Sequence, residues 1–427
     1  MVGAGVAGCI VASLLAKKGF NVCLIDAKRI EDVGDKVCGD ALIFRGLDQL
    51  GFEPPMDAIT NVASALNFHA PSIEPIKLKT RIFLLDRLKF GQYFLHKAID
   101  NGSIFLDKCR AFAPILEGDK VAGIKAKIDN SEVEFRAKAV IDASGINGVI
   151  RRSLPKDWWV SKPIEGHDLA LCYREIRKLK RSHINTDYCE VFYDRKFVPN
   201  GYYWVFPKKD DLVNVGLGAR ITTIDFDLKE KFYKNVLTNP IFNESEILAH
   251  GFGVLPINPF LNCFTASGFI TIGDAAGQVN PFIGEGIRPS IISAYIAAKT
   301  IAKSEGFEQD HLWSYNTEFM KKLGIRHAKF AILGSFFGRF DYEGVKSLLS
   351  VFEGGTYNFD DFEDFNISLF LTLRATLKGF KQLKSILKEA SIIKSVNSIY
   401  RKYPDSPKNF LRWLERVEQF WKDSHQN

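Results

Sequence analysis

The first nine residues, MVGAGVAGC (Met1–Cys9), place Gly3, Gly5 and Gly8 in the spacing G-x-G-x-x-G. This spacing suits a turn between a buried strand and a helix, where a dinucleotide pyrophosphate rests on the helix N-terminus. Only two residues precede the glycines, whereas a typical strand has about five or six. We therefore expect that roughly half a dozen residues of the first strand are missing, through a start codon assigned too late.

The residues after the glycines favour a dinucleotide site over the alternative, an ordinary tight turn. The stretch 9–20, CIVASLLAKKGF, is apolar at helical spacing and is closed by Gly19. The stretch 21–28, NVCLIDAK, predicts a short buried strand that ends at Asp26. A carboxylate at this place can accept hydrogen bonds from a ribose, as dinucleotide sites require.

Later segments favour FAD over NAD. The stretch 267–287, SGFITIGDAAGQVNPFIGEGI, predicts a strand at 269–272, then the pair Gly273-Asp274, then a glycine-rich turn into a helix. In flavoproteins such a Gly-Asp pair holds the pyrophosphate and ribitol. The following helix N-terminus directs N–H groups toward the flavin ring, where they stabilise negative charge.

A third strand supports the same interpretation. The stretch 137–145, AKAVIDASG, predicts a strand that ends at Asp142. A chain that returns repeatedly to the nucleotide domain is typical of FAD folds. An NAD enzyme would not need the Gly-Asp segment so far downstream.

Composition excludes several classes of protein. At 427 residues, 46% hydrophobic and 25% charged, the chain fits a soluble globular protein of two or three domains. We find no membrane span, signal peptide or nucleic-acid-binding module, and the net charge is a mild +7. The seven cysteines are scattered with no C-x-x-C, so we predict no metal site and a reducing cytoplasm.

Two further stretches carry a family resemblance: 34–42, GDKVCGDAL, and 199–207, PNGYYWVFP. Together with LLDRLKFG at 84–91, they resemble the geranylgeranyl reductase family of FAD flavoproteins. Within it, the chain is similar to archaeal reductases that saturate the prenyl chains of membrane lipids. The resemblance extends from Gly3 to about Asn316 with good motifs, and more loosely into the C-terminal region.

This resemblance implies an α/β fold with a Rossmann-like FAD-binding domain of the p-hydroxybenzoate hydroxylase type, an antiparallel-sheet substrate domain and a C-terminal helical region. It also implies contacts with FAD, carried over position by position. The implied FAD-binding residues are Gly3, Gly5, Gly8, Asp26, Cys38, Gly39, Arg87, Ala111, Asp274, Gly286 and Ile287.

Tyr202, Trp204 and Phe206 alternate at period two and so project to one face of a strand. Spacing alone favours ordinary core packing for them. The resemblance and the flanking prolines favour a second interpretation, the substrate-binding wall of an apolar tunnel. Cys38, Tyr202 and Trp204 are the candidates for side chains near the reacting carbons, with Tyr202 or Trp204 supplying a polar handle, and no proton donor is assigned.

The expected domains are discontinuous. Residues 1–65, 86–150 and 265–304 would form the FAD-binding domain, residues 66–85 and 151–264 the substrate-binding domain, and residues 305–427 a helical cap. In this cap, residues 374–402 are rich in lysine and arginine at helical spacing. They predict either a solvated helix face or peripheral contact with an anionic membrane surface.

The expected reaction is hydride transfer from reduced FAD to an isolated C=C bond of a prenylated lipid. Ferredoxin or NAD(P)H would supply the electrons. Two departures from the family pattern, Glu285 and Arg288, would lie beside the flavin ring. Two alternatives stay open: an FAD-dependent monooxygenase or halogenase on the same fold, and a flavin-free lipid-binding paralogue.

Overall fold

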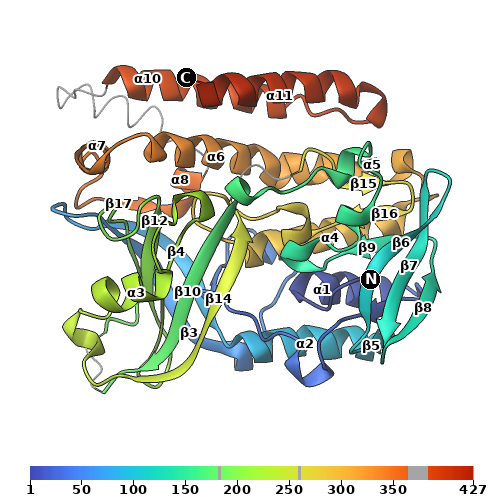
Figure 1. Ribbon diagram of the computed structural model, residues 1–427, viewed down its shortest axis with the longest axis horizontal. Helices are drawn as coiled ribbons and strands as arrows, with labels where there is room; N and C mark the ends of the chain where they lie inside the picture. The colour runs from blue at the N-terminus through green and yellow to red at the C-terminus, as the bar shows by residue number, and fades with distance from the viewer. Residues whose placement is uncertain (181–183, 258–260, 364–382, 427) are drawn as a thin grey trace.

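The computed structural model of the chain describes residues 1–180, 184–257, 261–363 and 383–426 (Figure 1). Its α-helices are α1 (Val6–Ala16), α2 (Arg87–Asp100), α3 (Leu228–Lys231), α4 (Ile287–Lys303), α5 (Gln309–Phe319), α6 (Ile325–Gly338), α7 (Tyr342–Leu349), α8 (Phe359–Glu363), α10 (Leu383–Tyr400) and α11 (Phe410–Gln426). Its strands are β1 (Cys23–Ile25), β2 (Ala41–Ile43), β3 (Ile59–His69), β4 (Ile76–Leu85), β5 (Ile104–Leu106), β6 (Arg110–Glu117), β7 (Lys120–Ile128), β8 (Ser131–Arg136), β9 (Val140–Asp142), β10 (Leu169–Lys178), β11 (Tyr188–Phe192), β12 (Gly201–Pro207), β13 (Leu212–Arg220), β14 (Glu246–Pro256), β15 (Thr265–Ala266), β16 (Phe269–Thr271) and β17 (Thr356–Asn358).

Short parallel strands and helix α1 form the Rossmann-like part. β1 pairs with β5, and β9 pairs with β16, both in parallel. Val2 connects the two pairs, because it forms parallel bridges to Ile25 and to Asp142. Residue 2 therefore stands where the strand before the glycine turn is expected. The predicted helix after the glycines and the predicted strands at β1, β9 and β16 are confirmed, and so is the helix α4.

The large sheet has nine strands in the described part of the chain, in the order β14-β10-β13-β12-β11-β3-β4-β17, with β2 also paired to β4. All its pairings are antiparallel except β11 with β3 and β17 with β4. The expected antiparallel sheet is therefore present. It also takes in residues 41–43, 59–65 and 356–358, which the sequence analysis assigned to other regions.

Strand β13 shows why this sheet has two buried faces. All its residues between the two ends are buried, so its sequence LVNVGLGAR lacks the polar alternation of a half-exposed strand. One face of the sheet packs against α3 and the turns around it, in an apolar cluster that includes Val215, Leu217 and Phe232. The other face, which carries Trp204 and Phe206, lines the cavity described below.

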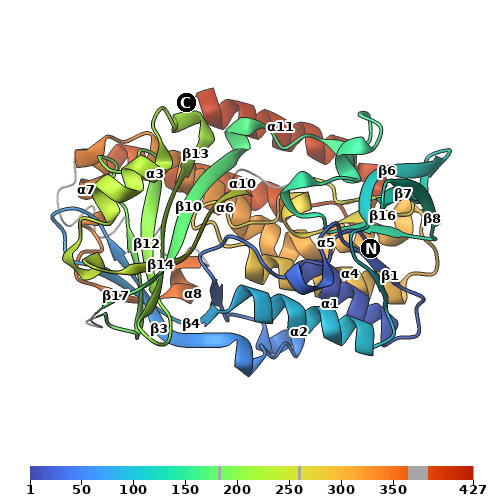
Figure 2. The ribbon, with the colours of Figure 1, turned by 60° about the horizontal axis from the view of Figure 1, so that its bottom comes forward.

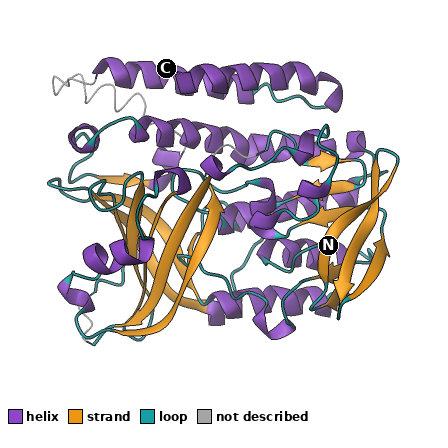
Figure 3. Ribbon diagram, viewed as in Figure 1, coloured by secondary structure: helices purple, strands orange, loops and turns teal. Residues whose placement is uncertain are grey.

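Helices fill the space between the sheets and cover the molecule. In Figure 3, α1 and α4 lie between the large sheet and the small antiparallel sheet β6–β8. Figures 1 and 2 show α10 and α11 side by side as an outer layer over α5 and α6. The cap expected at 305–427 is thus mostly helical where it is described, but β17 belongs to the large sheet because it pairs with β4.

The basic stretch expected at 374–402 is only partly described, since residues 374–382 lie outside the described residues. Within α10, Lys388 and Lys394 are exposed and Glu389 is buried. In the part of the chain that the structure describes, no helix has the length and apolar character needed to cross a membrane.

Candidate functional site

A cavity of about 400 Å³ extends from the N-terminus of α1 across the inner face of the large sheet. Gly5 and Arg87 line it from the Rossmann-like part, and the aromatic side chains of β12 line it from the sheet. Most of its wall is apolar, with side chains such as Phe68 and Leu78 far from the glycine turn along the sheet. Concave, mostly apolar sites with a few charged groups are typical of cofactor and substrate binding.

The glycine turn brings backbone close to backbone. Gly3 has φ of +98°, and a Cβ added there would lie 2.4 Å from the carbonyl oxygen of Ala143. A Cβ on Gly8 would lie 2.0 Å from the carbonyl oxygen of Gly3, so both positions require glycine. A Cβ on Gly5 would meet no atom within 4 Å, so this glycine opens onto free space at the start of α1.

Asp26 stabilises the same turn. Its Oδ2 accepts a hydrogen bond from the N–H of Ala4 at 2.7 Å, and its Oδ1 accepts one from the N–H of Lys28 at 2.8 Å. The predicted position of Asp26 at the end of the second strand is confirmed. It does not line the cavity, and its contact with a ribose stays a prediction.

The segment before α4 forms a second turn on the cavity. Gly273 has φ of +64° and Gly284 has φ of +66°, and both line the cavity with Asp274. The carboxylate of Asp274 pairs with Lys36 Nζ at 2.7 Å. Helix α4 follows Gly286 without a side-chain cap, so its first N–H groups have no partner within the helix.

The residues present fit a dinucleotide with a flavin ring. The N-termini of α1 and α4 both border the cavity, and neither has a side-chain cap. Arg87 also lines this cavity. Its Nε and Nη1 are buried and have no hydrogen-bond partner in the described structure. Two helix N-termini and an unpaired guanidinium in one cavity provide donors for anionic groups such as a pyrophosphate.

The aromatic residues of β12 turn their polar atoms into the protein. Tyr202 donates its hydroxyl hydrogen to the carbonyl oxygen of Ile283 at 2.7 Å, and burial raises the pKa of Tyr202. Trp204 donates its Nε1–H to Asn214 Oδ1 at 2.9 Å. Tyr202, Trp204 and Phe206 all line the cavity, so they present mainly apolar ring surface to it.

A buried network holds the Cys38–Asp40 turn against β12 and β13. Asp40 has φ of +62°, and its Oδ2 accepts hydrogen bonds from Lys208 Nζ at 2.8 Å and from Asn214 Nδ2 at 2.9 Å. Asn214 Nδ2 also donates to the carbonyl oxygen of Cys38 at 2.8 Å. Because Asn214 also bonds Trp204, one amide fixes both the Cys38 backbone and the indole ring.

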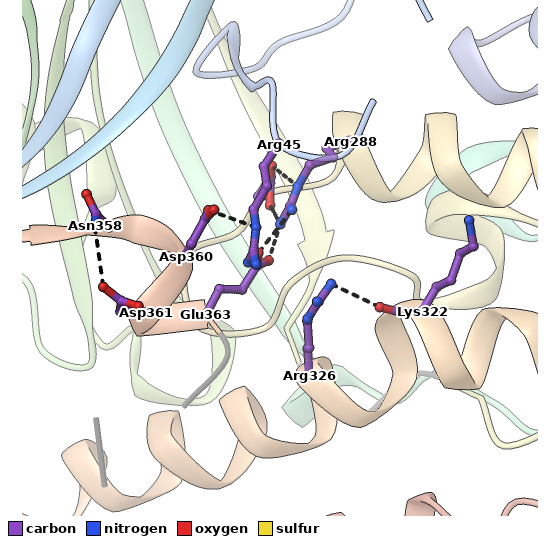
Figure 4. A network of polar contacts seen from close by, with 9 residues as sticks. Arg45, Arg288, Lys322, Arg326, Asn358, Asp360, Asp361 and Glu363 are labelled. Atoms are coloured by element: carbon purple, nitrogen blue, oxygen red, sulfur yellow. Dashed lines mark hydrogen bonds and ion pairs between the residues drawn. The ribbon is translucent and has the colours of Figure 1, made fainter. Parts of the chain in front are cut away.

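The two departures near α4, Glu285 and Arg288, pair with each other instead of leaving a free charge beside the cavity. Arg288 Nε and Nη2 lie 2.9 Å and 2.8 Å from the carboxylate oxygens of Glu285. Figure 4 shows Arg288 and Arg45 converging on Glu363 of α8. Burial alone would raise the pKa of Glu363, but these two guanidinium groups outweigh burial and lower it to about 2.

Comparison with known proteins identifies the family. A model of the geranylgeranyl reductase catalytic domain matches residues 168–255, and a model of the NAD(P)-binding Rossmann-like domain matches residues 1–33. The digeranylgeranylglycerophospholipid reductase of Thermoplasma volcanium is 30% identical over 336 residues, which are 75% of this chain and 81% of that protein. The chain belongs to the geranylgeranyl reductase family.

The similarity to this family extends over nearly the whole chain. The digeranylgeranylglycerophospholipid reductase of Sulfolobus acidocaldarius is 27% identical over 434 residues, which cover 98% of this chain and 96% of that protein. A solved geranylgeranyl bacteriochlorophyll reductase-like structure from Thermoplasma acidophilum has a TM-score of 0.81 at 22% identity. It covers 92% of this chain and 98% of its own, so the fold is shared.

The structure brings most of the residues implied by the geranylgeranyl reductase resemblance to one cavity. Those that line it are Gly5, Cys38, Gly39, Arg87, Asp274, Gly286, Ile287, Tyr202, Trp204 and Phe206. Gly3, Gly8 and Asp26 lie behind the lining, in the turn itself. Ala111 lies in β6, where it packs in an apolar cluster with Ile25 and Val121, and it does not line the cavity.

The sequence analysis missed three polar residues of this region: Arg174, Lys208 and Asn214. One of them left a signal. Asn214 is a single amide inside the apolar run LVNVGLGA, and a buried amide in a strand needs hydrogen-bond partners. Arg174 and Lys208 gave no sequence signal of burial, because charged residues are common in and near strands on the protein surface.

Proposed function

We propose that the chain is an FAD-dependent reductase that saturates carbon–carbon double bonds in the geranylgeranyl chains of membrane lipids or of their precursors. One observation carries the proposal: a single cavity joins two uncapped helix N-termini to a long apolar wall. Membership of the geranylgeranyl reductase family supports it and favours it over a monooxygenase or a halogenase.

The residues of the first turn of α1, with Arg87, would hold the FAD pyrophosphate, and Asp274 and Cys38 would lie beside the rest of the cofactor. The N–H groups at Gly286 and Ile287 would face the flavin ring, where they stabilise negative charge. When bound and reduced, FAD supplies the hydride, which is chemistry that no side chain of the chain provides. The electron donor would be ferredoxin or NAD(P)H.

The aromatic wall would orient the prenyl chain and exclude water from it. An isolated alkene has no polar group to recognise, so position depends on apolar contact along the cavity. Tyr202 and Trp204 suit this role because their hydroxyl and N–H groups are already bonded to the protein. The prenyl substrate would be delivered from a membrane, which the enzyme contacts peripherally.

The test is anaerobic turnover. The purified chain is incubated with FAD, reduced with dithionite and given a geranylgeranyl-bearing glycerophospholipid. We expect product masses to rise by two hydrogen atoms for each saturated bond. Oxygenated or halogenated products that form only in air would favour the monooxygenase or halogenase alternative, and failure to bind FAD would favour the flavin-free paralogue.

A matched pair of variants tests the wall. Phe206 lines the cavity, whereas Tyr203 lies on the opposite face of β12 and stacks on Phe192 with ring centroids 4.4 Å apart. We expect Phe206→Leu to lower kcat/KM for the prenyl lipid about tenfold, because an apolar contact in a binding pocket is lost. Tyr203→Leu should leave kcat/KM unchanged.

A further inference from the structure

Arg174 is a buried cation on the cavity wall. It lies on β10 two residues after Cys172, so both side chains project to the inner face of the sheet, and both line the cavity. Its exposed fraction is 7%. A guanidinium is rarely buried to this extent without a partner.

Apart from Arg87 and Arg174, the charged groups on the cavity wall have partners within the chain. Lys36 pairs with Asp274 at 2.7 Å, Asp40 with Lys208 at 2.8 Å, and Glu285 with Arg288 at 2.8 Å. Arg174 differs from them. Its Nε is buried without a hydrogen-bond partner, and among the described residues no side chain or carbonyl oxygen forms a hydrogen bond or an ion pair with its guanidinium.

The strands next to Arg174 offer its guanidinium no charged partner, and the side chain faces the cavity. In the sheet it lies opposite Gly216 of β13 and Gly251 of β14, so neither neighbour has a side chain to pair with it. The room over these glycines is taken by apolar groups. A Cβ on Gly216 would lie 2.4 Å from Trp204 Cζ2, and one on Gly251 would lie 2.6 Å from Val37 Cγ2.

The guanidinium therefore lacks a counter-ion from the protein, and burying it unpaired costs free energy. An anion that enters the cavity would remove this cost. Guanidinium binds phosphate well, because its planar group of N–H donors matches two phosphate oxygens at once.

We propose that Arg174 binds a phosphate group of the prenyl substrate and so selects phosphate-bearing prenyl chains over neutral ones. This inference rests on the proposed function. Two observations assign the phosphate to the substrate: Arg174 lies on the large sheet, within the part of the chain that matches the reductase catalytic domain, and Arg87 faces the cavity from the nucleotide-binding side.

The test compares two substrates with the same chain, geranylgeranyl phosphate and geranylgeraniol. The variants are Arg174→Met, which removes the charge, Arg174→Lys, which keeps it, and the control Lys178→Met, which removes an exposed charge of the same strand. We expect Arg174→Met to lower kcat/KM for the phosphate roughly 10- to 100-fold and to leave the alcohol unchanged, because charge-assisted hydrogen bonds are lost. Arg174→Lys should retain part of the preference, and Lys178→Met all of it.

A binding measurement separates this inference from the proposed function. The FAD-loaded chain is titrated with each prenyl compound, and binding is followed by tryptophan fluorescence, which needs no turnover. In the unsubstituted chain, inorganic phosphate should compete with geranylgeranyl phosphate. If the chain binds the phosphate through Arg174 but reduces nothing, the proposed function fails and the phosphate site stands.

Two results would overturn the inference. In the first, Arg174→Met weakens both prenyl compounds equally, which indicates a structural role. In the second, it shifts the flavin reduction potential and leaves the preference between the two compounds intact, which assigns the anion to the cofactor. If Arg174→Met does not fold, the competition by inorganic phosphate and the Arg174→Lys variant decide the question, since a chain without a phosphate preference contradicts the proposal.

Discussion

Asn214 shows how much one side chain can organise in this cavity. Its amide donates to the carbonyl oxygen of Cys38 and to Asp40, and accepts from the indole of Trp204. It is fully buried, so water cannot replace any of these partners. The Cys38 turn and the aromatic wall are therefore fixed together by a single residue.

We expect Asn214→Asp to destabilise the chain although the two side chains have the same shape. The new carboxylate would face the carbonyl oxygen of Cys38 and the carboxylate of Asp40 in place of an amide donor. The expected loss is about 2–4 kcal/mol in the free energy of unfolding, measured by urea denaturation. Reaction of Cys38 with a thiol reagent should also become faster, because its turn is no longer held.

The control for this change is Asn243→Asp at an exposed position outside the cavity. It should alter neither the urea midpoint nor the thiol reaction. Equal thiol reactivity in Asn214→Asp and the unsubstituted chain would show that Lys208 and Asp40 hold the turn without the amide.

At the scale of elements, α10 packs on α6 around a buried carboxylate. Glu389 is 3% exposed, its Oε1 has no hydrogen-bond partner in the described structure, and its Oε2 lies 3.7 Å from Arg339 Nη1. Burial raises the pKa of Glu389 to about 7, more than Arg339 and Lys388 lower it. The folded chain therefore holds a proton here that the unfolded chain releases near pH 4.5.

This difference predicts how stability depends on pH. Below about pH 4.5 both states are protonated at this site, and the stabilising contribution of the raised pKa is complete. As pH rises through 7 the contribution is lost, with a fall of up to roughly 3 kcal/mol in the free energy of unfolding. Glu389→Gln mimics the protonated form, so we expect a flatter profile between pH 5 and 8 and higher stability at pH 8 than in the unsubstituted chain.

Urea denaturation at a series of pH values measures both profiles. Glu343→Gln, at an exposed position of α7, is the control and should keep the slope of the unsubstituted chain. If Glu389→Gln keeps that slope as well, the α10–α6 contact opens to water and the carboxylate is not buried in solution.

The elements that could be predicted from the sequence are those with local signals. The glycines before α1, the strand that ends before Asp26 and the alternating aromatics of β12 each depend on residues a few positions apart. Arg174 could not be predicted as a cavity residue. Its place depends on the register of β10 between β13 and β14, which are joined to it by long connections and set by tertiary packing.

The same limit applied to the charges near α4. The sequence analysis expected Glu285 and Arg288 beside the flavin ring. In the structure Glu285 lines the cavity and Arg288 does not, and the position of either beside a flavin stays a prediction. The sequence analysis could not show that Arg288 turns away to Glu363, because the partner lies 75 positions further along the chain. Long-range ion pairs have no sequence signal of their own.

At the scale of the whole molecule, the cavity is bordered by both the Rossmann-like part and the large sheet, which also share one hydrophobic core cluster. Its wall is made from the glycine turn, from α2 and α4, and from most strands of the large sheet. A ligand that fills the cavity contacts both the Rossmann-like part and the large sheet. Binding should therefore stabilise the chain as a unit, and the change can be followed by thermal unfolding.

We expect FAD to raise the unfolding temperature, since a ligand that binds only the folded chain adds about 2.7 kcal/mol at a free concentration 100 times its Kd. Arg87→Met should require roughly 10- to 100-fold more FAD for the same rise, because the unpaired guanidinium no longer meets the pyrophosphate. Lys89→Met removes an exposed charge from the same turn of α2 and should behave as the unsubstituted chain does. Equal curves for both variants would show that Arg87 does not contact the cofactor, and the helix N-terminus of α1 would then have to bind the pyrophosphate without it.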